Sequence, residues 1–259
     1  MRIAFGVEYD GSGYHGWQRQ AGVISVQEVV EQALSRVAAH PVTVFCAGRT
    51  DTGVHAVGQV IHIETEAKRD MRAWVLGGNV NLPRDVGLLW AKPVPDDFHA
   101  RFGAVARRYR YIIANRWIRP AIHRHRAAWF HPLLDVQRMQ AGAEYLLGTH
   151  DFSSFRAVRC QAKSPIKTLH ELAVSRSGDY VAIDVYANAF LHHMVRNIAG
   201  VLMTIGCGER EPEWAAEVLT YRDRALGGVT APADGLYFVH AEYPPQFDLP
   251  PSPALPVLG

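Results

Sequence analysis

The sequence predicts an α+β fold of two ferredoxin-like halves, each with a mainly antiparallel sheet that carries its helices on one face. Two observations support this fold class. In residues 1–95, segments with the two-residue period of strands alternate with segments of helical period in the order β-α-β-β-α-β. The rest of the chain repeats this alternation with insertions, although no sequence repeat is visible.

The first half, residues 1–95, contains four predicted strands and two predicted helices. Alternate residues from Ile3 to Tyr9 are apolar, as in a half-buried strand. Ser25 and Glu28 form a capping box that begins a helix. In chain order we expect a strand at 2–10, a helix from Ser25, strands at 42–47 and 59–65, a helix at 69–80 and a strand at 86–91.

The second half, residues 96–243, begins with a strand that places Tyr109 on one face and Arg108 and Arg110 on the other. Six prolines between Pro244 and Pro256 predict a flexible tail over residues 244–259. Within the half we expect a strand at 107–114, an irregular segment at 117–131, a helix capped by Asp135, a hairpin of 172–176 and 180–187, helices at 191–205 and from Pro212 to Val218, and a strand at 236–243.

The composition is that of a globular protein, with 48% hydrophobic and 20% charged residues among 259. No apolar run approaches the roughly 20 residues that a membrane helix needs. The chain starts directly on an alternating strand, which predicts that there is no signal peptide. The three cysteines are odd in number and far apart, which indicates a reducing, cytoplasmic environment.

Positive charge is segregated along the chain, although the net charge is only +2. Residues 101–126 hold eight arginines and no acid, and residues 152–170 hold Arg156, Arg159, Lys163 and Lys167 without an acid. Such segregation would create one positive face for a phosphate backbone. The alternative is a solvated surface on which the charges cluster by chance.

A polar loop follows the predicted strand at 42–47. Gly48 and Gly53 bracket it, and Asp51 lies inside it, two residues after Arg49. An aspartate at such a corner, with a guanidinium nearby, could act as a nucleophile or a general base. The alternative is an Asx-turn, in which the carboxylate binds its own backbone.

Four stretches together resemble the tRNA pseudouridine synthase A family, in the order and spacing of that family. The likeness covers the chain from about Ile3 to Tyr243. The stretches are Gly48-Arg49-Thr50-Asp51-Thr52-Gly53-Val54-His55-Ala56, Tyr9-Asp10-Gly11-Ser12-Gly13-Tyr14-His15-Gly16-Trp17-Gln18-Arg19-Gln20, Phe98-His99-Ala100-Arg101-Phe102 with Arg107-Arg108-Tyr109-Arg110-Tyr111, and Phe190-Leu191-His192-His193-Met194-Val195-Arg196-Asn197-Ile198.

The resemblance implies an enzyme that isomerises uridine to pseudouridine at positions 38, 39 and 40 of the anticodon stem-loop of tRNA. Its partners would be tRNA and a second copy of the chain in a homodimer, with no membrane. Nothing is oxidised or hydrolysed overall, so neither a redox cofactor nor a metal is required. The target uridine would leave its stack to enter an active-site cleft between the two halves.

The resemblance also assigns roles to individual residues. Asp51 matches the catalytic aspartate, and Arg49, Tyr109, Arg196 and Leu236 are expected to bind the substrate, with Arg196 pairing with Asp51. The helical pattern around Arg196 is mainly apolar, where an unpaired charge would be costly. RNA contacts are expected from the following cations: Arg19, Arg101, Arg107, Arg108, Arg110 and Arg156.

Two other functions fit the sequence less well. A non-catalytic RNA-binding protein on ferredoxin-like domains would expose sheet aromatics in an RRM-type signature, which the sequence lacks. An aspartyl-phosphate enzyme needs a second Asp or a Lys directly beside the nucleophile, where this chain has Thr52. His15, His55, His192 and His193 fit no standard metal-site spacing.

Overall fold

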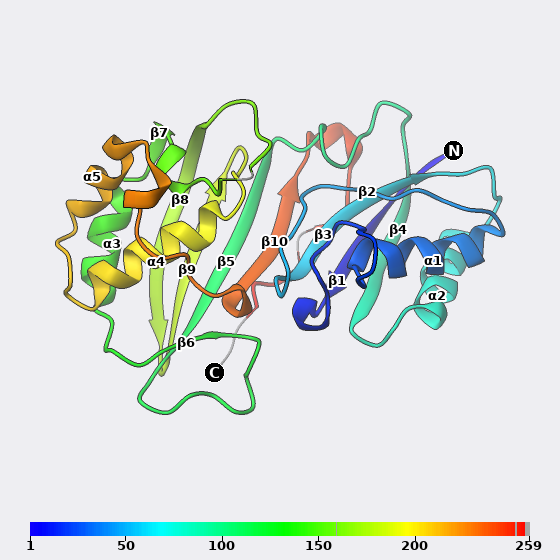
Figure 1. Cartoon of the computed structure of the whole chain (residues 1–259). Helices are drawn as coiled ribbons and strands as arrows, with labels where there is room; N and C mark the ends of the chain where they lie inside the picture. The colour runs from blue at the N-terminus through cyan, green and yellow to red at the C-terminus, as the bar shows by residue number, and fades with distance from the viewer. Residues whose placement is uncertain (159, 252, 257–259) are drawn as a thin grey trace. The chain divides into compact units, whose positions relative to one another are not determined.

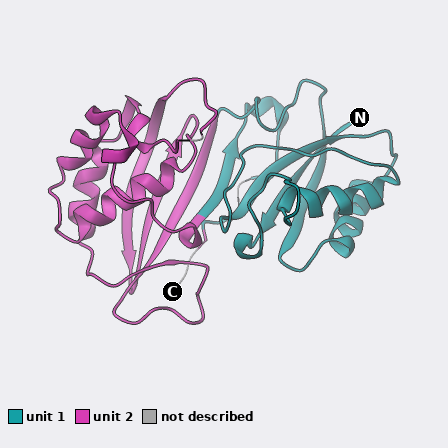
Figure 2. Ribbon diagram, viewed as in Figure 1, with its two compact units in different colours: residues 1–105, 237–255 teal, residues 106–236, 256–259 magenta. Residues whose placement is uncertain are grey.

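The computed structural model describes residues 1–158, 160–251 and 253–256, so Arg159, one of the predicted basic residues, lies outside the described part. The chain divides into two compact units, teal and magenta in Figure 2. Unit 1 comprises residues 1–105 and 237–255, and unit 2 comprises residues 106–236 with Pro256. Unit 1 thus extends beyond residue 95 and takes in most of the last strand, which the sequence-based division gave to the second half.

Unit 1 has the element order β-α-β-β-α-β. Strand β1 pairs antiparallel with β3 on one side and β4 on the other, and β2 pairs antiparallel with β3. Strand β10 (Leu236–Glu242) pairs parallel to β3 through Tyr237 and Phe238. The other elements are β1 (Arg2–Tyr9), α1 (Val26–Ala38), β2 (Phe45–Cys46), β3 (His55–Glu64), α2 (Met71–Asn81) and β4 (Val86–Val94).

Helices α1 and α2 lie on one face of the unit 1 sheet (Figure 1). Helix α1 begins where the Ser25 side chain accepts a hydrogen bond from the Glu28 amide, as its capping box predicts. Trp74 of α2 is fully buried and meets Phe5 of β1 edge to face, with ring centroids 6.0 Å apart. Burial of one such side chain contributes about 2–3 kcal/mol, which anchors α2 to the sheet.

Unit 2 is built on the antiparallel strand order β5-β9-β8-β7, with the short strand β6 parallel to β5. Helix α4 is its central helix, with eleven buried residues along its length. The elements are β5 (Ala106–Asn115), β6 (Ala128–Phe130), α3 (Val136–Glu144), β7 (Gly148–Asp151), β8 (Ile166–Ser177), β9 (Tyr180–Ala187), α4 (Met194–Gly206) and α5 (Trp214–Tyr221).

The predicted fold class is confirmed, since both units combine helices with mainly antiparallel sheets. Several details differ from the sequence-based elements, and β6 (Ala128–Phe130) lies within the segment 117–131 that was expected to be irregular. Strand β2 has only two residues, β7 was not expected, and α4 begins at Met194 rather than Leu191. The late start follows from His193, whose backbone has φ 63° and cannot continue a right-handed helix.

The proline-rich segment after β10 packs against unit 1. Phe247 is buried with its ring 5.1 Å from that of Phe98, and Lys92 binds the Asp248 carboxylate at 2.6 Å. Ser252 and residues 257–259 of the predicted flexible tail lie outside the described part, and the mobility of the tail stays a prediction. Among the helices of the described residues, none is long and apolar enough to span a bilayer.

Candidate active site

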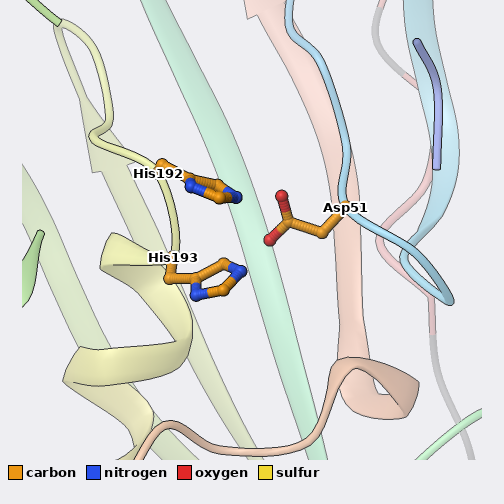
Figure 3. A group of neighbouring side chains, drawn as sticks. All are labelled: Asp51, His192 and His193. Atoms are coloured by element: carbon orange, nitrogen blue, oxygen red, sulfur yellow. The ribbon is translucent and has the colours of Figure 1, made fainter. Parts of the chain in front are cut away.

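Asp51 lies in unit 1, on the loop that joins β2 to β3. Figure 3 draws its side chain on this loop. Asp51 is half-buried, its neighbour Thr52 is exposed, and Thr50 on the other side is buried. Asp51 thus lies between a buried neighbour and an exposed one.

The base of the Asp51 loop is fixed by hydrogen bonds to the sheet. The Gln59 amide donates to the Gly48 carbonyl at 2.7 Å and accepts from the Gly48 amide at 3.3 Å. The Thr50 hydroxyl lies 2.8 Å from the phenol oxygen of Tyr9 on β1. Burial raises the pKa of the Tyr9 phenol above its ordinary value, so this hydrogen bond joins two neutral groups.

A second loop, residues 11–17, packs against the Asp51 loop. The Trp17 amide donates to the Thr50 carbonyl at 3.0 Å, and the Gly11 amide donates to Nδ1 of His55 at 3.1 Å. A Cβ on Gly11 would lie 1.9 Å from the Val54 carbonyl oxygen, so only glycine allows this approach. Two of the four recognised sequence stretches thus form one interlocked structure.

This arrangement is suited to presenting a carboxylate. The chain before Asp51 is held by Tyr9, Trp17 and Gln59, and after Asp51 the Gly53 amide donates to the Tyr14 carbonyl at 3.4 Å. A side chain on a loop held in this way keeps its position when a ligand arrives, which is the property that a positioned nucleophile or base needs. Arg49 lies on the same loop and is exposed.

The other predicted substrate-binding residues lie in unit 2. Tyr109 is on β5 and only 9% exposed, and its ring meets Phe190 edge to face at 5.0 Å. Leu236, at the start of β10, is 5% exposed. Both side chains are buried rather than solvent-facing.

Arg196 lies in the first turn of α4. Its Nε donates to the Ala231 carbonyl at 2.8 Å, and its own carbonyl accepts from the Ala231 amide at 3.1 Å. The preceding His192 and His193, drawn in Figure 3, have ring centroids 4.1 Å apart. The pairing of Arg196 with Asp51 and the cleft between the halves stay predictions.

A buried polar network supports the helix turn that carries Arg196. Asn197 is fully buried; its amide donates to the Phe155 carbonyl at 2.7 Å, and its oxygen accepts from Arg224 at 3.0 Å and from Thr230 at 2.7 Å. Arg224 also donates to Thr230 at 2.7 Å. Sequence reasoning missed these residues, because partners this far apart in the chain leave no local pattern.

Two of the arginines predicted to bind RNA form ion pairs across the unit 2 sheet. Arg110 makes two hydrogen bonds, of 2.8 and 2.7 Å, to Asp184 on β9. Arg108 makes two, of 2.9 and 2.7 Å, to Glu171 on β8. The hydrogen bonds from Arg108 hold the pKa of the Glu171 carboxyl below its ordinary value. Much of the charge on this face of β5 is therefore compensated.

The remaining predicted RNA contacts lie at several places. Arg19 is exposed and pairs with Glu31 of α1 at 3.3 Å, and Arg107 donates to the Asn188 carbonyl at 3.2 Å. Arg156 donates to the Cys160 and Ala162 carbonyls. Arg101 is exposed, with its guanidinium 5.4 Å from the ring centroid of Phe102.

Comparison with known proteins identifies the family of the chain. A family model described as tRNA pseudouridine synthase matches residues 6–103 and 143–244. Relatives named tRNA pseudouridine synthase A include one from Pseudomonas aeruginosa, 60% identical over 96% of this chain and 88% of its own length, and one from Nitrosococcus oceani, 60% identical over 96% of both chains. Another, from Alcanivorax borkumensis, is 57% identical over 99% of this chain and 96% of its own.

A solved structure titled "Crystal Structure of a Cbf5-Nop10-Gar1 Complex" aligns with 92% of this chain and 49% of its own, at 11% identity and a TM-score of 0.37, which is too weak a likeness to inform the fold. The family model and the relatives are decisive, because they match most of the chain at high identity and include the Asp51 loop. The chain belongs to the tRNA pseudouridine synthase A family.

Proposed function

We propose that this protein isomerises uridine to pseudouridine at positions 38, 39 and 40 in the anticodon stem-loop of tRNA, with Asp51 as the catalytic carboxylate. The observation that carries the proposal is the Asp51 loop, in which a half-buried carboxylate residue stands on a backbone fixed by Tyr9, Trp17 and Gln59. Family membership supports the reaction type.

The reaction needs little beyond a carboxylate and a closed pocket. The bond from C1′ of the ribose to N1 of uracil breaks, the uracil turns, and a bond forms from C1′ to C5. The C5 proton is lost and N1 gains a proton, so no electrons are gained or lost overall. Asp51 would act at the sugar or the base while the detached uracil is retained.

The substrate-binding residues have distinct tasks in this proposal. Arg49, exposed beside Asp51, would hold a phosphate of the flipped nucleotide. Tyr109 would stack on uracil and take part in proton transfer through its hydroxyl. Arg196 would pair with Asp51, and Leu236 would supply an apolar wall.

The RNA would be held by all the predicted basic residues. These include Arg108 and Arg110, which form ion pairs across the unit 2 sheet. Removing charge at Arg107, Arg108 and Arg110 should weaken tRNA binding and reduce its salt dependence. Because Arg108 and Arg110 also pair with Glu171 and Asp184, urea denaturation must show that the variant is folded under the binding conditions. We also propose that the protein acts in the cytoplasm as a homodimer with the RNA lying across both subunits. Light scattering of the purified protein tests the dimer, which a monomeric mass would contradict.

Replacement of Asp51 tests the central assignment. Asp51→Asn and Asp51→Ala should abolish tritium release from tRNA labelled at C5 of uridine and leave tRNA binding intact. The matched control is Asp70→Asn, which removes the same charge from an exposed helix cap that asparagine also caps well. Turnover retained by the Asp51 variants would contradict the proposal.

A further inference from the structure

A group of rings, of which Phe45 and Phe102 are exposed, lies in unit 1 where β2 pairs with the C-terminal part of β3. Its rings are those of Phe45 on β2, His62 on β3, and His99 and Phe102 from the segment after β4. Together with Arg101 of the same segment they are called the aromatic patch below. Phe45 is 43% exposed and Phe102 is 76% exposed. Phe45 lies three residues before Gly48, where the Asp51 loop begins.

The rings of the aromatic patch contact one another in a continuous series. Phe45 stacks on His62 with centroids 5.0 Å apart and planes 19° from parallel. His62 meets His99 at 4.7 Å, and His99 meets Phe102 at 4.5 Å. Because His62 covers one face of Phe45, the exposed area of Phe45 lies on the rest of its ring.

The exposed ring of Phe102 stands on a fixed backbone. Nδ1 of His99 accepts hydrogen bonds from the amides of Arg101 at 3.1 Å and Phe102 at 3.2 Å. The Gly103 amide donates to the His99 carbonyl at 2.8 Å, which closes the turn. Nδ1 of His62 in turn accepts from the Ala100 amide at 3.2 Å. The folded backbone thus fixes an apolar ring in an exposed position. The stability of an exposed turn does not need such a ring.

Charged groups lie near these rings: two arginines beside β2, and Glu64, which pairs with Arg2 near His62. Burial raises the pKa of the Cys46 thiol to about 12, and the nearby guanidinium groups of Arg49 and Arg101 oppose that rise. Both cations therefore lie close to β2, on which Phe45 sits. Burial lowers the pKa of His62 to about 4, so this ring is neutral near pH 7 and stacks without adding charge.

We propose that the aromatic patch binds one unpaired nucleotide of the RNA substrate, with the base stacked on Phe45 and Phe102 and a neighbouring phosphate bound by Arg101. Stacking on protein rings is available to every base, whereas the flanking cations select an anionic ligand. The inference rests on the proposed function for the identity of the RNA, and it adds a binding site where β2 pairs with β3, six residues before Asp51.

The charge at the aromatic patch favours RNA over a second copy of the chain. Arginine and aromatic residues also occur in protein interfaces, but single-stranded RNA sites combine cations with exposed rings, and the second arginine, Arg49, adds positive charge that a phosphate backbone would neutralise. Arg101 lies over the ring of Phe102, so a base and a phosphate of one nucleotide could be held by adjacent residues.

The test measures the affinity of a fluorescent anticodon stem-loop RNA for variants of the whole protein. Phe102→Leu keeps apolar volume and removes the ring; it should lower affinity about ten-fold, whereas Phe102→Tyr should bind like the wild type. Phe45→Leu should act like Phe102→Leu. Leu76→Ala, at a 54% exposed position on α2, is the control and should bind normally. Arg101→Ala should reduce the salt slope of binding by about one, and Phe102→Leu should leave it unchanged.

Wild-type affinity in both Phe102→Leu and Phe45→Leu would overturn the inference. So would a change of molecular mass by light scattering in these variants, since that would assign the rings to a protein contact. Failure of the proposed function is separate: there the wild type would release no tritium from labelled tRNA. If the wild type turns over and the ring variants match it in affinity, only the aromatic patch assignment fails.

Discussion

The backbone of Gly16 lies directly against the carbonyl oxygen of Thr50. A Cβ on Gly16 would lie 2.7 Å from that oxygen, closer than real side chains approach. The next amide, of Trp17, donates a 3.0 Å hydrogen bond to the same oxygen. The position of Asp51 therefore depends on a glycine 35 residues earlier in the sequence.

Gly16→Ala should reduce turnover by ten-fold or more. Gly16 has φ 82°, so alanine is strained there by about 1–2 kcal/mol, and its methyl group also displaces Thr50 and with it Asp51. A displacement of about 1 Å at a catalytic group can cost 100-fold in rate. Tritium release under saturating tRNA measures the effect, and KM for tRNA should change little.

Gly22→Ala is the matched control for this prediction. Gly22 has φ 79°, and its Cβ would meet none of the described atoms within 4 Å. The variant should lose about 1–2 kcal/mol of unfolding free energy and keep the wild-type kcat. Equal rates in the two alanine variants would show that the contact with Thr50 does not position Asp51.

The fold of unit 1 follows from sequence because its signals are local. The alternation from Ile3 to Tyr9 and the capping box of Ser25 and Glu28 each specify an element within a few residues, and the structure has β1 and α1 there. Strand β7 was missed because its residues Gly148–Asp151 are polar and show no alternation. Its pairing with β8 is decided by long-range contacts.

Arg110→Ala should destabilise the protein more than Arg108→Ala. The side chains of Arg110 and Asp184 are 13% and 11% exposed, so losing the arginine leaves a buried carboxylate unpaired. This should lower the free energy of unfolding by about 3–5 kcal/mol. The side chains of Arg108 and Glu171 are 27% and 44% exposed, and water screens that pair. With the contact of Arg108 over Tyr186, its loss should cost about 1–2 kcal/mol.

Urea denaturation of both variants measures this difference. The double variant Arg110→Met with Asp184→Leu should recover most of the loss, because it removes the unpaired charge along with its partner. Losses of equal size in Arg108→Ala and Arg110→Ala would contradict the assignment of Arg110 to a buried structural pair.

Sequence reasoning placed Arg108 and Arg110 on one strand face but could not supply their partners. Glu171 and Asp184 lie on β8 and β9, and the register of strands so distant in the chain has no signature in any one of them. The same limit hid Phe45 and His62, which stack because β2 and β3 pair at these two residues. The sequence motifs identify Asp51. The pairing of strands that are distant in the chain determines which other groups surround each site.

His62 should make the protein less stable as the pH falls from about 6.5 to about 4. Burial lowers the pKa of His62 to about 4 in the folded state, whereas the unfolded chain titrates near 6.5. Between these values the unfolded state binds the extra proton, so acid favours unfolding by up to about 3 kcal/mol. Below pH 4 both states are protonated and this contribution is constant.

Urea denaturation at pH 7, 5.5 and 4 checks the effect of His62. His62→Asn keeps an acceptor near the position of Nδ1 for the Ala100 amide but has no titrating ring. Its unfolding free energy should therefore fall less over this range than that of the wild type. Parallel curves for the two proteins would show that His62 does not titrate on unfolding.

Asn197→Ala should lower kcat by ten-fold or more while KM for tRNA stays within about two-fold. Asn197 holds Thr230, and the adjacent Ala231 makes two hydrogen bonds to Arg196. Without the amide, the Phe155 carbonyl and one N–H of Arg224 lose their hydrogen bonds to Asn197. This loss should lower the free energy of unfolding by about 2–3 kcal/mol. The orientation of Arg196 should then be lost, which affects turnover if Arg196 acts on Asp51 or the uracil.

Two further variants separate positioning from stability in this network. Thr204→Val removes a hydroxyl from the same helix that donates to the Gly200 carbonyl one turn earlier, within the described part of the chain, and should leave kcat unchanged. Asn197→Asp keeps the oxygen that accepts from Arg224 and Thr230, so it should retain most of kcat although it loses the bond to Phe155. If Asn197→Ala lowered the urea midpoint but kept the wild-type kcat, Asn197 would be a structural residue, and the link through Ala231 to Arg196 would have no part in turnover.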